Sequence, residues 1–279
     1  MDFTSKDILH VKKNGVEYLS FKILKEFGVN NYITLRFGGV SSAEYNKSLN
    51  FRYTGLDTKE NVLKNLDIIK KEANIKNDIY KAMQAHTDKI LVINKDNMEN
   101  YKFKNFCNEN YDGYVVNEKG IYTLVTTADC NPIILYDKKN NVYANIHSGW
   151  MGTIKKIYLN AFKIMQKKFG TNAEDLIVCV GPSINKCCFT SKEESFKKKF
   201  TDVFENEQEY LYYEEDKETF HIDMPYLIKR DFINLGANKK NIILSNICTK
   251  CNNKYFFSAR DSRQKGYEDF GTFTTIVGI

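Results

Sequence analysis

Two histidines and one cysteine, His86, Cys130 and His147, could together hold a catalytic metal ion. Each lies at the end of a predicted helix or strand, where polar side chains often face the crevices that bind ligands. Imidazoles and a thiolate suit Zn²⁺ and also copper, and three protein ligands leave one coordination position open for water or substrate. Because no two of the three have helix-like or Cys-x-x-Cys spacing, a buried structural histidine and a packed cysteine remain open alternatives.

The sequence around Cys130 and His147 supports a site rather than a core position. Cys130 follows Asp129, a charged neighbour that suits an apolar core poorly. Asp129 is itself a candidate acid or base, with a turn residue as the alternative. His147 precedes a turn with Gly149 and Gly152, and glycines let the backbone approach a ligand closely.

The other cysteines offer a competing motif. Cys248 and Cys251 form a Cys-x-x-Cys pair with a possible metal or redox role, but one pair lacks the second pair that a closed zinc site needs. A disulfide between the adjacent Cys187 and Cys188 would be strained, so we interpret them as packing residues near the site. Seven irregularly spaced cysteines without an export signal predict free thiols in a reducing, cytoplasmic environment.

Arginine is scarce, so each arginine near a turn is informative. Arg36 precedes a Gly-Gly turn, and Arg260 and Arg263 follow an aromatic run at 255–258. Any of them could clamp an oxyanion through two hydrogen bonds, and a structural salt bridge is the alternative for each. We predict that Arg36 and Arg260 bind substrate, with His221 as a weaker candidate.

The hydrophobic pattern predicts helices and strands in irregular alternation. Amphipathic helices are expected over 58–73 and over 153–169, the second capped by Thr153 and ended by Gly170. A capping box formed by Ser191 and Glu194 and the proline at 225 each predict a further helix start. Expected strands are 88–93, 121–127, 133–136, 142–146, 176–180, 242–246, 255–258 and 272–277. This order indicates the α+β class, an α–β sandwich with mixed sheets flanked by helices, in one domain over 1–279.

Composition narrows the range of partners. The net charge of +6 is spread over 41 basic and 35 acidic residues, and the longest basic cluster, 197–199, falls on a predicted helix face. No basic and aromatic residues interleave as base stacking requires, so we expect no nucleic-acid binding. No run of 18 apolar residues and no signal peptide is visible, which predicts a cytoplasmic protein without membrane contact. We expect a monomer or a weak homodimer.

Several short blocks, in order along the chain, resemble the laccase-domain (YfiH-type, multicopper polyphenol oxidase-like) family. The blocks are Arg36-Phe-Gly-Gly-Val-Ser41 with Ser48-Leu49-Asn50, Gln84-Ala-His86-Thr-Asp88, Asp112-Gly113, Thr127-Ala-Asp-Cys-Asn-Pro132, His147-Ser-Gly-Trp150 with Gly152, Gly181-Pro-Ser-Ile184 with Cys187-Cys188-Phe189, His221-x-Asp223, and Cys248-Thr249 leading to Phe256-Phe257-Ser258-x-Arg260. Each block alone is weak, whereas all of them in register cover most of the chain.

The resemblance implies a zinc-dependent purine nucleoside phosphorylase with adenosine deaminase activity. Its substrates would be phosphate and adenosine, inosine, guanosine or methylthioadenosine, and His86, Cys130 and His147 would hold the metal. It also implies a layered fold related to a bacterial toxin deamidase domain. Met151 stands where the family signature has arginine, so phosphate binding would be weakened or would fall to Arg36 and Arg260.

Three rival functions remain open from the sequence. A copper-dependent polyphenol oxidase of the multicopper type would need more imidazole ligands than four histidines supply. A metal-free hydrolase could use Cys130 as the nucleophile and His147 as the base. A binding module without catalysis is the third alternative.

Overall fold

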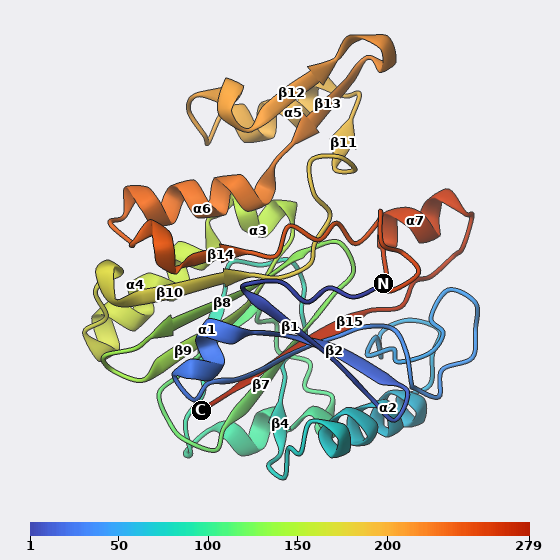
Figure 1. Ribbon diagram of the computed structural model, residues 1–279, viewed down its shortest axis with the longest axis vertical. Coiled ribbons are helices and arrows are strands. Elements are labelled where there is room, and N and C mark those ends of the chain that lie inside the picture. The colour runs from blue at the N-terminus through green and yellow to red at the C-terminus, as the bar shows by residue number, and fades with distance from the viewer.

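Two six-stranded sheets stacked face to face form the body of the protein (Figure 1). The computed structural model describes residues 1–279. The first sheet has the strand order β1 (Ile8–Lys13), β2 (Val16–Phe21), β3 (Asn30–Thr34), β15 (Phe273–Gly278), β7 (Tyr122–Thr127) and β4 (Ile79–Tyr80). The second has the order β14 (Ile242–Leu244), β10 (Leu176–Val180), β8 (Asn131–Asp137), β9 (Val142–Ser148), β6 (Gly113–Val116) and β5 (Ile90–Val92). Each sheet contains both parallel and antiparallel pairs, so the predicted mixed sheets are confirmed.

Strand β8 shows why the central strands of the second sheet are apolar along their whole length. Ile134 and Tyr136 contribute to the core between the two sheets, whereas Ile133 and Leu135 contribute to the core beneath the helices. Since side chains alternate along a strand and both faces of this sheet are covered, every position of β8 is buried.

Helices cover both outer faces of the stacked sheets (Figure 1). Helix α2 (Lys59–Glu72) packs Val62, Leu66 and Ile69 on the first sheet, and Thr58 caps it by accepting a hydrogen bond from the backbone of residue 61. Helices α4 (Ile157–Phe169) and α6 (Met224–Asn234) cover the second sheet. The remaining helices are α1 (Lys22–Glu26), α3 (Trp150–Ile154), α5 (Glu194–Thr201) and α7 (Ala259–Gln264). The layered α+β architecture is as predicted.

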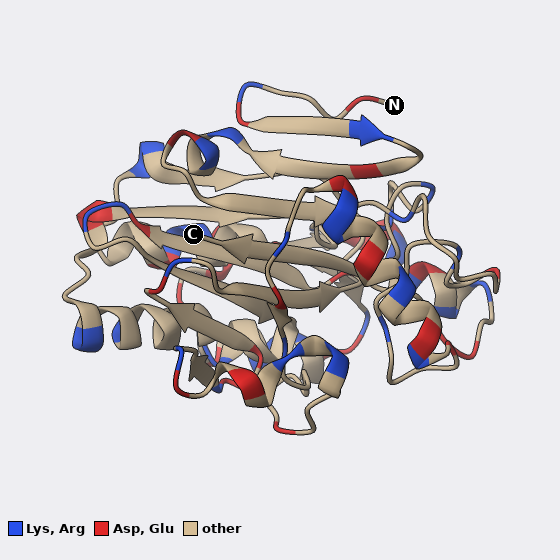
Figure 2. Cartoon of the chain, turned by 90° about the horizontal axis from the view of Figure 1, so that it is seen from below, with Lys and Arg blue, Asp and Glu red and all other residues tan.

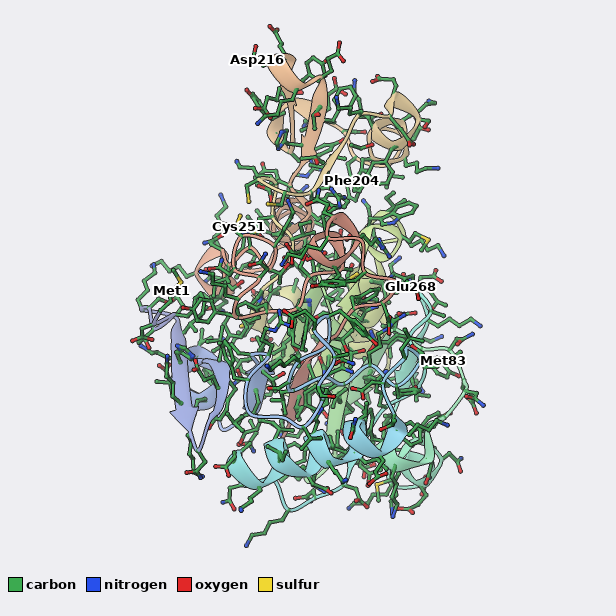
Figure 3. The ribbon with its side chains drawn as sticks, turned by 90° about the vertical axis from the view of Figure 1, so that its right-hand side faces the viewer. Met1, Met83, Phe204, Asp216, Cys251 and Glu268 are labelled. Carbon is green, nitrogen blue, oxygen red and sulfur yellow. The ribbon has the colours of Figure 1, made fainter.

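A small lobe, residues 190–222, projects from one end of the body (Figures 1 and 3). It contains α5 and a three-stranded sheet of β11 (Thr190–Ser191), β13 (Thr219–Ile222) and β12 (Leu211–Glu214). Its own core includes Phe200 and Phe204, and Figure 3 places Asp216 at its tip. The sequence predicted no strand here.

The predicted helix 153–169 is two helices. Lys156 adopts a left-handed conformation with φ 54° and separates α3 from α4. Thr153 therefore lies inside α3 instead of capping a helix, whereas Gly170 does end α4 in the left-handed conformation. The apolar residues keep helical spacing on both sides of Lys156, so the sequence pattern predicted one continuous helix.

Two further local predictions are wrong, while others are confirmed. Residues 255–258 form a turn whose last residue, Ser258, caps α7 by accepting a hydrogen bond from the Asp261 backbone. Helix α5 begins after Glu193 without any side-chain cap, so the proposed capping box does not form. The strand at 176–180 and the proline-initiated helix α6 agree with prediction.

Charge is distributed without a dominant sign on the face seen in Figure 2. Lys and Arg segments alternate there with Asp and Glu segments along the outer helices and loops. No helix in the structure combines the length and the apolar character needed to cross a bilayer.

Candidate metal centre and active-site cavity

The structure brings His86, Cys130 and His147 together from three different segments. Cys130 lies in the bend that carries the chain from β7 in one sheet to β8 in the other, and His147 lies near the end of β9. His86 comes from the loop between β4 and β5. One donor atom from each residue lies within 4.8 Å of the other two, so residues far apart in sequence share one site at the edge of the stacked sheets.

The distances within this cluster suit metal coordination. Nε2 of His86 lies 3.7 Å from Sγ of Cys130, and the two imidazole centroids are 4.9 Å apart. A tetrahedral zinc ion would separate a nitrogen and a sulfur ligand by about 3.6 Å, from its usual Zn–N and Zn–S bond lengths. The three donors therefore fit a metal such as zinc or copper with one position left open.

The carboxylate of Asp112 orders two of the three candidate ligands. It accepts a hydrogen bond from Nδ1 of His147 at 2.8 Å, which leaves Nε2 for a metal. It also accepts the backbone N–H groups of Ala85, His86 and Thr87. Asp112 is fully buried and directly precedes β6, which pairs with β9. One carboxylate thus fixes both the ring of His147 and the loop that carries His86.

The same contacts shift the protonation of the cluster. Burial raises the pKa of Asp112, but the hydrogen bond and charge of His147 outweigh it and lower the pKa to about 2. For His147, burial favours the neutral ring, whereas Cys130 and Asp112 together raise its pKa to about 9. For Cys130, burial is outweighed by both histidines, which lower the pKa of the thiol to about 6. A thiolate, the form that binds metals, is therefore favoured near neutral pH.

The backbone around the cluster lies unusually close to the candidate ligand side chains. A Cβ atom at Gly149 would lie 2.9 Å from Sγ of Cys130 and 2.9 Å from Cδ2 of His86, so only glycine leaves room for this site. His86 and Asp129 both adopt positive φ angles, 56° and 86°. Such conformations cost free energy in non-glycine residues and are concentrated at functional sites.

A cavity of about 380 Å³ opens onto the three candidate ligands. Its aromatic lining residues are Phe51, Tyr53, Trp150, Phe189 and Phe270, and its cationic ones are Arg52, Lys81, Arg260 and Arg263. Asp129 is the single acidic side chain in the lining. Rings beside several cations and a candidate metal centre suit a ligand that has both a flat apolar part and negative charge.

Asp129 and Arg260 are joined in the cavity wall. The Asp129 carboxylate accepts hydrogen bonds from Oγ1 of Thr249 and from the backbone N–H of Arg260, both at 2.7 Å. Burial raises the pKa of Asp129 despite these hydrogen bonds. The guanidinium of Arg260 in turn donates to the carbonyls of Cys188 and Thr190. Both residues line the cavity, and the acid–base role of Asp129 and the substrate-binding role of Arg260 stay predictions.

Arg36 and His221 lie outside the cavity lining. The Arg36 guanidinium lies over the ring of Phe257 and donates to the carbonyls of Glu44, Lys47 and Asn253, which fixes the surrounding loops. His221 lies in the lobe, between the carbonyl of residue 186 and a carboxylate oxygen of residue 214. Met151, in contrast, does line the cavity.

Lys81 is a cavity residue that the sequence does not single out. Its ammonium donates to the carbonyl of Ala82 and to Oε1 of Gln84, and the residue is only 4% exposed. Burial lowers its pKa to about 7, with a smaller opposing effect from Asp112. Nothing in the sequence around a lone lysine signals such burial, because most lysines are exposed.

We expect Lys81→Met to change how stability depends on pH. Between about pH 10.5 and 7 the unfolded chain gains a proton at Lys81 while the folded chain does not, so wild-type stability falls as the pH falls. For each unit that the pH falls within this window, the free energy of unfolding of the variant should therefore rise by about 1.4 kcal/mol relative to that of the wild type. Urea unfolding at pH 7.0 and at about pH 9 measures the difference, with the exposed Lys104→Met as matched control. A constant offset between Lys81→Met and wild type would contradict the buried amine.

The fold and the cavity define a class of protein: a stacked-sheet α+β protein with a His–Cys–His cluster at the sheet edge. The family described as multi-copper polyphenol oxidoreductase laccase matches residues 30–279. The chain therefore belongs to this family, and the resemblance seen in its sequence blocks is confirmed.

Known proteins share both sequence and fold with this chain. A purine nucleoside phosphorylase from Bacteroides thetaiotaomicron is 29% identical over 245 residues, covering 87% of this chain and 90% of its own. An adenosine deaminase called RL5, from an unknown prokaryotic organism, is 31% identical over 171 residues, covering 60% of this chain and 62% of its own. The crystal structure of the hypothetical protein YfiH from Bacillus licheniformis superposes with a TM-score of 0.86 at 21% identity, over 99% of this chain and 100% of that one. This last likeness confirms the YfiH type of fold.

Proposed function

We propose that the protein is a zinc-dependent purine nucleoside phosphorylase that also deaminates adenosine. His86, Cys130 and His147 would hold the zinc ion, which would act as a Lewis acid toward the nucleoside when bound. The observation that supports this most is the junction of the His–Cys–His cluster with a cavity that offers both aromatic and cationic groups. Relatives called purine nucleoside phosphorylase and adenosine deaminase give the reaction classes.

The cationic side chains account for the second substrate. Arg260, Arg263 and Lys81 line the cavity, and guanidinium groups bind phosphate through paired hydrogen bonds. They would hold phosphate beside C1′ of the nucleoside and offset its charge as the bond to the purine breaks. Met151 supplies no cation at the signature position, so the phosphate affinity would depend mainly on Arg260 and Arg263. Lys81 would add a charge only as the pH falls through its lowered pKa of about 7.

The aromatic side chains account for the purine. Phe189 and Trp150 line the cavity, and a ring stacked on a purine holds it without selecting one base. This suits a site that accepts adenosine, inosine, guanosine and methylthioadenosine. Asp129, with its raised pKa, would hold the Arg260 backbone in place and is the candidate acid for the leaving base.

The test compares nucleoside turnover with and without phosphate. We expect the zinc-loaded protein to release free purine from adenosine and inosine only with phosphate, and to convert adenosine to inosine without it. Chromatography of the nucleosides and bases, with ribose 1-phosphate measured separately, distinguishes the two reactions. Absence of turnover with all four nucleosides, in protein shown to carry zinc, would overturn the proposal.

Polyphenol oxidation is the rival suggested by the family's description, and a His–Cys–His set accepts copper as well. A multicopper oxidase needs further imidazoles near the first site, yet His10 lies on β1 and His221 in the lobe, both outside the cavity lining. Oxygen uptake with a phenol, in protein with stoichiometric copper, would favour the oxidase.

A further inference from the structure

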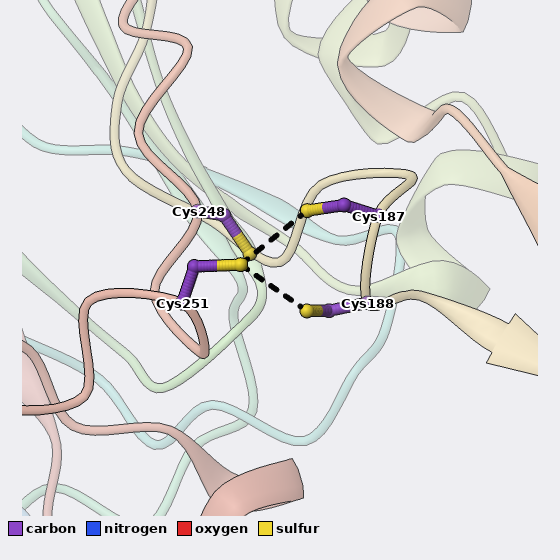
Figure 4. Close-up of side chains that lie close together, drawn as sticks. All are labelled: Cys187, Cys188, Cys248 and Cys251. Atoms are coloured by element: carbon purple, nitrogen blue, oxygen red, sulfur yellow. Dashed lines mark hydrogen bonds between the residues drawn. The ribbon is translucent and has the colours of Figure 1, made fainter.

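Four cysteines outside the cavity cluster converge at the base of the lobe (Figure 4). Cys187 and Cys188 come from the loop between β10 and β11, and Cys248 and Cys251 come from the turn after β14. All four sulfur atoms lie within 4.8 Å of one another, and none forms a disulfide. Two segments some 60 residues apart in sequence thus contribute two thiols each.

This arrangement corrects the interpretation of Cys187 as a packing residue, whereas Cys188 does pack against the core at the base of the lobe. Cys187 and Cys251 are exposed, Cys188 is half-buried, and only Cys248 is buried. Exposed thiols gain little from packing, so the burial of apolar surface does not explain why the thiols of Cys187 and Cys251 point toward those of Cys188 and Cys248 (Figure 4).

The sulfur–sulfur distances match a tetrahedral metal site. Sγ of Cys251 lies 3.6 Å from that of Cys187 and 3.4 Å from that of Cys188. Zn–S bonds in tetrahedral geometry would separate two sulfurs by about 3.8 Å, so each of these two pairs would move apart by only a few tenths of an ångström to admit the ion. The Cys-x-x-Cys spacing of residues 248 and 251 is one that structural zinc sites use, and the second pair that the sequence lacked is supplied by 187 and 188.

The surroundings suit bound thiolates. Lys186 precedes the first cysteine pair, and Lys250 lies between the two cysteines of the second. Cationic neighbours offset the net negative charge of a metal held by four thiolates.

We propose that Cys187, Cys188, Cys248 and Cys251 bind a structural zinc ion, separate from the ion of the cavity. Four thiolates close the coordination sphere and leave no position for substrate, which makes the site structural. This proposal depends neither on the proposed enzymatic activity nor on the His–Cys–His cluster, so its test is independent of theirs.

The position of the site gives it a mechanical consequence. Figure 3 places Cys251 where the lobe meets the body. The chain on one side continues into Phe189, which lines the cavity, and on the other side Thr249 binds Asp129. The carbonyl of Cys188 accepts a hydrogen bond from Arg260. An ion here would tie the lobe to the cavity wall and hold that wall in shape.

The experiment is cobalt and zinc analysis in a Cys130→Ala background, which removes the cavity site. We expect this protein to bind one equivalent of Co²⁺ with the thiolate charge-transfer and intense visible bands of a tetrahedral, all-sulfur site. Cys187→Ser in the same background should weaken these bands, shift them and lower zinc affinity at least about tenfold. Cys107→Ser, which alters a cysteine outside both clusters, is the matched control.

Further measurements on the Cys130→Ala protein distinguish the remaining outcomes while all four cysteines of the cluster stay intact. Zinc released from the Cys130→Ala protein by a mercurial should amount to one equivalent. Its loss should speed proteolysis within residues 190–222. A Cys130→Ala protein that is folded and reduced but binds no cobalt or zinc would overturn the proposal. So would a disulfide among the four cysteines in protein purified under reducing conditions, or copper(I) bound there in preference to supplied zinc.

Discussion

Cys130→Ala should lower both phosphorolysis and deamination on the order of 10³-fold, equivalent to about 4 kcal/mol of transition-state stabilisation. The substitution removes the only sulfur among the three candidate ligands, and two imidazoles alone hold zinc weakly. Because Cys130 lies in a bend and is half-buried, the loss of stability should be small. Elemental analysis should show one equivalent less metal than wild type, and circular dichroism should show an unchanged fold.

The control for this prediction is Cys107→Ala, a change of the same kind at a half-buried cysteine away from the cavity. It should retain the metal and the rates of wild type. Full adenosine turnover in purified Cys130→Ala protein would show that the His–Cys–His cluster is not the catalytic centre, whatever its metal content.

A metal-free hydrolase predicts a different pH dependence. In that reading the reactive form is a Cys130 thiolate beside a protonated His147, which exists between their pKa values of about 6 and about 9. Activity of chelated protein would then rise through about pH 6, fall through about pH 9 and vanish on alkylation of Cys130. The zinc proposal instead expects chelated protein to be inactive at every pH and zinc to restore it.

The three candidate ligands could be proposed from local features, but only the family resemblance joined them into one set. Cys130 follows β7 and His147 lies near the end of β9, and a polar residue at such a position stands out. The partnership of Asp112 with His147 could not be predicted in this way, because it depends on the pairing of β6 with β9. Gly113 lies opposite Ile146 in that register, which brings Asp112 beside His147. Register is a tertiary property that a single sequence specifies only weakly.

The lobe and the four-cysteine cluster were missed for related physical reasons. Strand β12 has no buried residue, and β11 is two residues long, so neither carries the alternation by which strands are recognised. Their stability comes from packing on the lobe's aromatic core and not from local propensity. The cysteine pairs at 187 and 248 appeared separate because nothing in either segment indicates that the two loops meet.

Asp112→Asn should lower metal affinity by about 10- to 100-fold and stability by about 3 kcal/mol, even though the side chains are nearly the same size. The carboxylate accepts hydrogen bonds from His147 and from three backbone N–H groups. An amide replaces one accepting oxygen with an N–H₂ group that faces donors, so buried N–H groups lose their partner. The affinity is measured by competition with a chelator, and the stability by urea unfolding.

The matched control is Asp137→Asn, at a fully buried aspartate that closes the β8–β9 turn by accepting from the backbone of Lys139 and Asn140. It should lose stability without losing metal affinity.

The dependence of stability on acid gives a second test of Asp112. Because the pKa of its carboxyl group is lowered to about 2, the charged carboxylate contributes fully to the stability of the fold above about pH 4, near the ordinary pKa of an aspartate. This contribution is lost as the pH falls toward 2. The stability difference between wild type and Asp112→Asn should therefore shrink by about 2 kcal/mol across that window. An undiminished difference, or unchanged metal affinity, would mean that Asp112 does not hold the ligand histidines through its charge.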